Sequence, residues 1–213
     1  MRTRLWLSCV FLAIPGTLAT ACGQEIQITL TADMVFNERE RGNPEAMVDE
    51  QSKIGDPPSG QPDSTWQINS QYWKSFPYSA YLDLGRERNL ASLWLFDTFN
   101  HGELIIYAGA PGNWQKVLQH ETMKYMHWTR LQLDVSTRYL RIERVKPSCI
   151  FSEIALYEYT PAAHQAMLNK RAAEAKENAA REAALATARQ EAANRPLVDM
   201  GPLFGRLKLV EEI

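Results

Sequence analysis

Hydrophobic and polar residues alternate in several short stretches of this chain, which indicates strands with one buried face. The alternation is clear in residues 25–31, 81–85, 131–135 and 139–143, where apolar residues occupy every second position. Residues 90–96 are nearly all apolar, as expected of a strand that is buried on both faces. Turn-forming clusters separate these stretches, and no helical repeat lies between them. The pattern predicts an all-β fold, an antiparallel β-sandwich or jelly roll.

One segment before these strands is dominated by residues that break regular structure. Residues 52–64 read SKIGDPPSGQPDS and hold three prolines and two glycines. Proline removes a backbone donor and glycine weakens a strand, so we expect neither a helix nor a central strand here. The segment is predicted to be a long surface loop.

The C-terminal part of the chain has a different composition. Of the 34 residues from Pro161 to Asn194, 14 are alanine, and Glu, Lys and Arg supply much of the rest. Thr160 is placed to act as N-cap with Pro161 in the first turn, and Pro196 marks the stop. Large apolar residues are few, so we predict a solvated helical spacer of residues 161–195, roughly 50 Å long at about 1.5 Å per residue. The alternative is a coiled-coil oligomerisation helix, which the lack of apolar heptads disfavours.

Both ends of the chain carry signals of their own. Residues 1–21 combine Arg2 and Arg4 with an apolar run and the small residues Ala-Thr-Ala, which predicts a secretory signal peptide and an exported protein. Cleavage there would leave Cys22 first, as in a bacterial lipoprotein anchored by lipid; the alternative is simple secretion into the periplasm or medium. Residues 196–213 turn apolar again and form either a strand that folds back or the start of a further domain.

Charge and cysteine content narrow the choice of function. The net charge is −2, and loss of the two signal-peptide arginines would make it −4. No basic stripe of the kind that binds nucleic acid occurs. Cys149 is expected to be a lone buried thiol, with a Cys22–Cys149 disulfide as the alternative if Cys22 carries no lipid.

Six short motifs follow one another in the middle of the chain, and their order is more specific than any one of them. They are STW at 64–66, YLDLG at 81–85, LFD at 95–97, YAGAPGNW at 107–114, TRYLRI at 137–142 and SEIALYE at 152–158. This series resembles the discoidin-like, galactose-binding-like family, which includes coagulation-factor type C domains and bacterial carbohydrate-binding modules. The resemblance covers roughly residues 40–158 and implies a domain, residues 22–160, that binds a ligand through loops at the end of a sandwich.

The resemblance also implies a structural calcium ion in the carbohydrate-binding members. By position its ligands here would be Asp49, Thr65 and Glu153, with Asp63 as an extra, and calcium prefers such oxygen donors. The loop 52–64 departs from the short loop typical of those members. The alternative is that Glu153 caps a loop through backbone amides and that no metal binds.

Sugar recognition needs aromatic faces for the apolar side of the ring and polar groups for the hydroxyls. We expect stacking from Trp73 and Trp114 with Tyr72, and hydrogen bonds from Asn100 and His101. The alternative is that these aromatics only cover an end of the core. A second set of aromatics is expected in the core itself, namely Trp66, Trp128 and Tyr139.

Evidence for catalysis is weak. No hydrolase, metalloprotease, P-loop or dinucleotide motif occurs in the sequence. Asp49 and Glu50 are adjacent carboxylates that would point to opposite faces of a strand. The sequence therefore predicts a non-catalytic carbohydrate-binding module of an exported bacterial protein. The alternatives are an envelope protein–protein interaction module of the same fold and the N-terminal part of a larger carbohydrate-active hydrolase.

Overall fold

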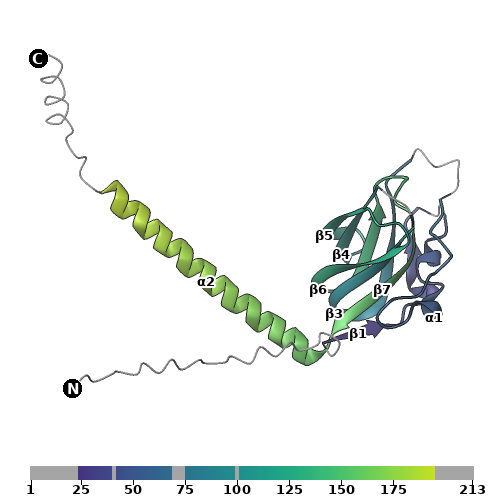
Figure 1. Ribbon diagram of the computed structural model, residues 1–213, viewed down its shortest axis with the longest axis horizontal. Coiled ribbons are helices and arrows are strands. Elements are labelled where there is room, and N and C mark those ends of the chain that lie inside the picture. The colour runs from purple at the N-terminus through teal and green to yellow at the C-terminus, as the bar shows by residue number, and fades with distance from the viewer. Residues whose placement is uncertain (1–23, 40–41, 69–74, 99–100, 195–213) are drawn as a thin grey trace, which may run out of the picture. The chain divides into compact units, whose positions relative to one another are not determined.

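The computed structural model describes residues 24–39, 42–68, 75–98 and 101–194. The chain divides into two compact units between His164 and Gln165. The first unit holds every described strand, and Figure 1 shows these strands stacked beside one another. The second is dominated by a single helix.

The described part of the first unit contains seven strands and several short helices. The strands are β1 (Glu25–Ile28), β2 (Val35–Asn37), β3 (Tyr78–Asp97), β4 (Gly102–Ala110), β5 (Asn113–Thr122), β6 (His127–Arg144) and β7 (Phe151–Tyr159). The short helices are η2 (Ala32–Met34), η3 (Pro44–Met47) and α1 (Gln51–Ile54). All pairings are antiparallel, in the order β1-β7-β3-β6-β4-β5, and β2 also pairs with β3.

The long strands β3 and β6 take part in both layers of the sandwich. The first part of β3, up to Asp83, pairs with β2 and with the end of β6, which also pairs with β4. The second part of β3, from Leu90, pairs with β7 and with the start of β6. Between these parts the register shifts, and Gly85 and Asp134 have positive φ values of 74° and 51°. Such irregularities bend and twist strands, and they let one continuous ladder close around a core.

The core follows the predicted alternation. Leu82 and Leu140 enter the core from the first part of β3 and the end of β6. Leu93 and Leu133 enter it from the second part of β3 and the start of β6. Trp66, which is 1% exposed, lies in the same cluster. The predicted all-β antiparallel sandwich followed by a long helix is confirmed.

The outer face of the β7-β3-β6 layer is also buried, and this corrects the prediction for residues 52–64. Trp94, Ala155 and Tyr157 point away from the main core and pack with Ile54, which is fully buried at the end of α1. The segment is therefore not a plain surface loop: it begins with a helical turn and covers the sheet. This cover explains why residues 90–96 are apolar on both faces.

The helix α2 runs over Pro161–Ala193, close to the predicted bounds, and none of its residues is buried. The Thr160 hydroxyl accepts a hydrogen bond from the Ala163 N–H at 3.3 Å, as the predicted N-cap requires. Among the described residues, no helix combines the length and the apolar character needed to cross a membrane. Cys149 is a free, fully buried thiol, as expected.

Candidate functional site

The ligand-binding residues predicted from the sequence do not form one cluster among the described residues. Tyr72, Trp73 and Asn100 lie outside the described part of the chain. His101 precedes β4, and its N–H donates to the Thr122 carbonyl at 2.8 Å. Trp114 begins β5, at the other end of the β4–β5 hairpin. Trp114 and Thr122 are eight positions apart along β5, roughly 26 Å at about 3.3 Å per residue, so Trp114 and His101 cannot contact one sugar ring.

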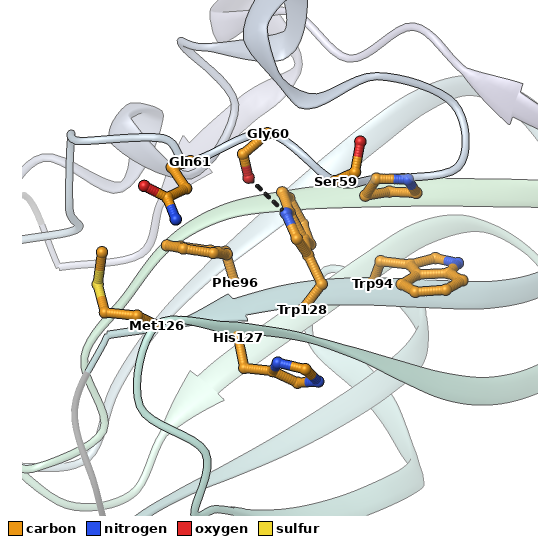
Figure 2. Close-up of a pocket in the computed structure, with 9 residues that line it drawn as sticks. Ser59, Gly60, Gln61, Trp94, Phe96, Met126, His127 and Trp128 are labelled. Carbon is orange, nitrogen blue, oxygen red and sulfur yellow. Dashed lines mark hydrogen bonds between the residues drawn. The ribbon is translucent and has the colours of Figure 1, made fainter.

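A pocket of about 340 Å³ lies at the His101 end, between the sheet and the segment that covers it. Its floor comes from the end of β3 and the start of β6, where Phe96 pairs with Trp128. Its lining residues are Pro58, Ser59, Gly60, Gln61, Trp94, Phe96, Met126, His127 and Trp128. Figure 2 shows the Trp128 ring rising from the sheet toward Gly60, with Phe96 on one side of it and Trp94 on the other.

The geometry of the pocket is fixed by contacts between the covering segment and the sheet. Trp128 Nε1 donates to the Gly60 carbonyl at 2.7 Å (Figure 2). The Tyr157 hydroxyl donates to Asp56 Oδ1 at 2.8 Å. The N–H groups of Ser59 and Gly60 both donate to the Ile54 carbonyl. The pocket is therefore formed before any ligand arrives.

The chemistry of the lining is aromatic and neutral. Trp94 and Trp128 are half-buried, so parts of their rings remain open to a ligand. Ser59 and Gln61 are exposed and supply a hydroxyl and an amide. His127 also lines the pocket, although its ring points away from the covering segment in Figure 2. Among the described residues, no Asp, Glu, Lys or Arg side chain lines the pocket.

Trp114 belongs to a separate group of rings, which we call the outer aromatic face: Phe36, Tyr81, Trp114 and Tyr139. Tyr81 is its centre, with ring centroids 5.0 Å from Phe36, 5.7 Å from Trp114 and 6.1 Å from Tyr139. Arg138 lies 4.9 Å from the Tyr139 ring centroid. Tyr139 is half-buried here, so the expectation that it belongs to the core is only partly met, whereas that for Trp66 is confirmed.

Two of the predicted metal ligands do come together. Asp49, Glu50 and Glu153 place carboxylate oxygens within 4.8 Å of one another. Glu50 was not predicted, because adjacent residues on a strand point to opposite faces. Residues 49 and 50 lie in a turn instead, which corrects that expectation. Thr65 accepts a hydrogen bond from the Gln67 amide and stays a prediction as a ligand.

The electrostatics of this acidic cluster differ from one carboxylate to the next. Glu153 is fully buried, and loss of solvent raises its pKa to about 7 despite hydrogen bonds from the Gln51 amide and the Glu50 N–H. Burial also acts to raise the pKa of Glu50, but contacts from Lys53 and from the N–H groups of residues 63 and 64 outweigh it and lower that pKa.

The cluster fits a divalent cation in the type and spacing of its donors. Calcium binds six to eight oxygens, and three carboxylates supply part of such a shell. Gln51 Oε1 is buried and has no hydrogen-bond partner, which adds an oxygen beside Glu153. The carboxylates also accept hydrogen bonds from backbone and side-chain N–H groups. Such bonds are what the alternative role of Glu153, capping a loop through backbone amides, requires.

The pocket itself was missed by sequence reasoning. Trp128 was expected in the core, and Trp94 was one apolar residue among many. The sequence did offer one signal: Trp94, Phe96 and Trp128 are large aromatic residues in or just before two predicted strands. A sheet with such residues needs other parts of the chain to cover both of its faces. The sequence does not show that residues 58–61 provide that cover.

Several solved structures are similar to this chain. A family 32 carbohydrate-binding module from Clostridium perfringens NanJ, in complex with galactose, shares 13% identity at a TM-score of 0.48, over 63% of this chain and 99% of that one. The C. perfringens module CpGH89CBM32-5, in complex with GalNAc-β-1,3-galactose, shares 10% identity at a TM-score of 0.46, over 60% of this chain and 97% of that one. A family 89 glycoside hydrolase from the same organism shares 18% identity at a TM-score of 0.45, over 64% of this chain and 15% of that one.

These modules have the discoidin or galactose-binding-like fold that the sequence motifs resemble, and some of them are parts of glycoside hydrolases. No protein-family model and no curated protein matches the sequence.

Proposed function

We propose that this chain is a non-catalytic carbohydrate-binding module and that the aromatic pocket beside Trp94 and Trp128 takes one neutral sugar ring. The observation that carries the proposal is a preformed pocket of about 340 Å³ with three aromatic walls, whose described lining holds no Asp, Glu, Lys or Arg side chain. Small-molecule sites typically begin at about 300 Å³ and combine apolar walls with a few polar groups. Galactose, which the NanJ module binds, is one ring of suitable size.

The mechanism follows from the two sides of a pyranose. Its C–H face packs against an indole ring, and its hydroxyl groups at the edge exchange hydrogen bonds with Gln61 and Ser59 at the mouth. A hexose has about 12 non-hydrogen atoms; at roughly 0.3 kcal/mol each, binding contributes about 4 kcal/mol, or a Kd of about 1 mM. Binding is weak, so its use is local concentration of whatever the module is attached to. A carboxylate pair of the glycosidase kind is lacking in the described lining.

The test is binding of neutral monosaccharides and oligosaccharides, followed by NMR chemical shifts. Trp94→Ala and Trp128→Phe should weaken binding at least fivefold. Trp114→Ala is the matched control, because that tryptophan lies at the other end of the β4–β5 hairpin. If Trp114→Ala abolishes binding and the two pocket variants bind normally, the pocket is not the glycan site.

A structural calcium ion is a second part of the proposal. Asp49, Glu50 and Glu153 would hold it, with Thr65 as the further ligand predicted from the sequence. Its role would be to neutralise the carboxylates and fix the start of the covering segment, not to take part in chemistry. The exported location, the lipid on Cys22 and an appended domain beyond Ile213 are proposals that rest on residues outside the described ranges.

The outer aromatic face favours a second candidate function, a protein–protein interaction module. Tyrosine, tryptophan and arginine are the residues most enriched at interface hot spots. A bound envelope partner that is lost with Phe36→Ser and Trp114→Ala, while glycan binding persists, would support it. Retention of that partner by both variants would count against it.

A further inference from the structure

The turn between β5 and β6 carries three large apolar side chains into solvent. Met123 is 62% exposed, Tyr125 is 65% exposed and Met126 is 40% exposed. Met126 also lines the aromatic pocket (Figure 2), and Met123 and Tyr125 precede it in the same turn. Three large exposed apolar side chains in one turn beside a pocket need an explanation, whereas scattered single ones do not.

The backbone of this turn is anchored, so the exposure is built into the structure. Thr122 is fully buried, and its hydroxyl accepts the Gly102 N–H at 2.9 Å. The Lys124 N–H donates to the buried Asp97 carboxylate at 3.1 Å. Met126 has a φ of 51°, a left-handed backbone conformation that residues other than glycine and asparagine seldom adopt. These contacts fix the backbone that carries the three exposed side chains.

We propose that Met123, Tyr125 and Met126 form a second subsite, which contacts the next sugar residue of a glycan whose end ring lies in the aromatic pocket. The inference rests on the proposed function. Tyr125 offers a ring face for stacking and a hydroxyl for a hydrogen bond, and the thioethers of the two methionines adapt to an irregular sugar surface. The subsite makes the module selective for glycan chains of two or more residues over free monosaccharides.

The size of the patch favours a sugar over a protein partner. Three large side chains at about half exposure present roughly 300 Å², since each buries on the order of 200 Å² when fully covered. A stable protein interface covers about 800 Å² on each partner. One pyranose ring covers an area of the smaller size. Met126 belongs both to this turn and to the pocket lining, which favours one ligand that contacts both.

The experiment compares a monosaccharide with the disaccharide that extends it. Methyl β-galactoside and lactose, and the matching pairs for glucose, mannose and their N-acetylated forms, are titrated against the full chain by NMR. We expect the best disaccharide to bind five- to tenfold more tightly than its monosaccharide. The double variant Met123→Ser, Tyr125→Ala should remove that gain and leave monosaccharide affinity within twofold. Ile26→Ser, which alters an exposed apolar side chain on β1, should change neither.

Each outcome has a distinct meaning. If no monosaccharide or disaccharide binds the unmodified chain, the proposed function fails and the subsite fails with it. If monosaccharides bind but disaccharides bind no better, or if the double variant lowers both affinities equally, the pocket stands and the subsite is refuted. If the double variant changes only binding to phosphatidylcholine–phosphatidylglycerol vesicles, the patch contacts lipid and the subsite is again refuted.

Discussion

Ionisation of Glu153 should make the sandwich less stable as the pH rises from about 5 to about 8. This carboxyl group is fully buried, and loss of solvent raises its pKa from 4.5 to about 7. The nearby carboxylates of Asp49 and Glu50 add to the rise, and the Gln51 amide opposes it. Between those pH values the folded protein holds a proton that the unfolded chain has released. Stability therefore falls with increasing pH across this range.

The size of the effect follows from the two pKa values. A gap from 4.5 to about 7, at about 1.4 kcal/mol for each pH unit, gives about 3 kcal/mol between acidic and mildly alkaline solution. Other carboxylates with lowered pKa values, such as Asp83, act in the opposite direction. The pH dependence of the unfolding free energy of the unmodified chain therefore combines both effects. The informative quantity is the difference in unfolding free energy between Glu153→Gln and the unmodified chain.

Urea unfolding in EDTA, at several pH values from 5 to 8, measures that difference. We expect the stability of Glu153→Gln relative to the unmodified chain to increase by about 2.5 kcal/mol from pH 5 to pH 8, since part of the full effect lies outside this range. The amide keeps an acceptor for Gln51 and never ionises. Glu158→Gln, on the same strand but ion-paired with Arg88, controls for loss of a negative charge. A difference that stays constant across this pH range would refute the argument from burial.

Three further outcomes can be checked with the same protein. Millimolar calcium should raise the melting temperature at pH 8 by several degrees, and Glu50→Gln or Glu153→Gln should abolish the rise, as differential scanning calorimetry would show. Gly60→Ala should lower glycan affinity at least tenfold in NMR titrations, because its Cβ would lie 1.8 Å from the Lys53 carbonyl oxygen and displace the covering segment. Normal affinity of that variant would show that the segment can shift freely. The Cys149 thiol, whose pKa burial raises to about 12, should resist alkylation at pH 8 until urea unfolds the chain; rapid native labelling would contradict its burial.

The strands and the long helix could be predicted because their signals are local. Leu82 and Leu84 alternate with polar residues, and the pairing with β6 and β2 buries that side as the period of two requires. The helix from Pro161 needs only a cap and residues of high helix propensity. In both cases a few neighbouring residues carry the information.

The covering segment and the acidic cluster could not be predicted in the same way. Ile54 is fully buried because it meets Ala155 and Tyr157, about 100 positions later in the chain, and no local pattern encodes that contact. Glu50 joins Glu153 because residues 49–50 form a turn, whereas a strand was assumed. Proline and glycine indicate irregular backbone in this region, but they do not determine which surface of the sheet that backbone covers.

The covering segment connects the two candidate sites. It starts and ends at the acidic cluster, where Glu50 accepts the N–H groups of Asp63 and Ser64 at 2.5 and 2.8 Å, and between these ends it reaches the pocket at Gly60. Ile54 and Gly60 hold the part in between against the sheet. A ligand entering such a pocket does not have to order the backbone that surrounds it. Since ordering costs reduce affinity and a single sugar ring offers few contacts, a preformed pocket is what a weak glycan binder of this size requires.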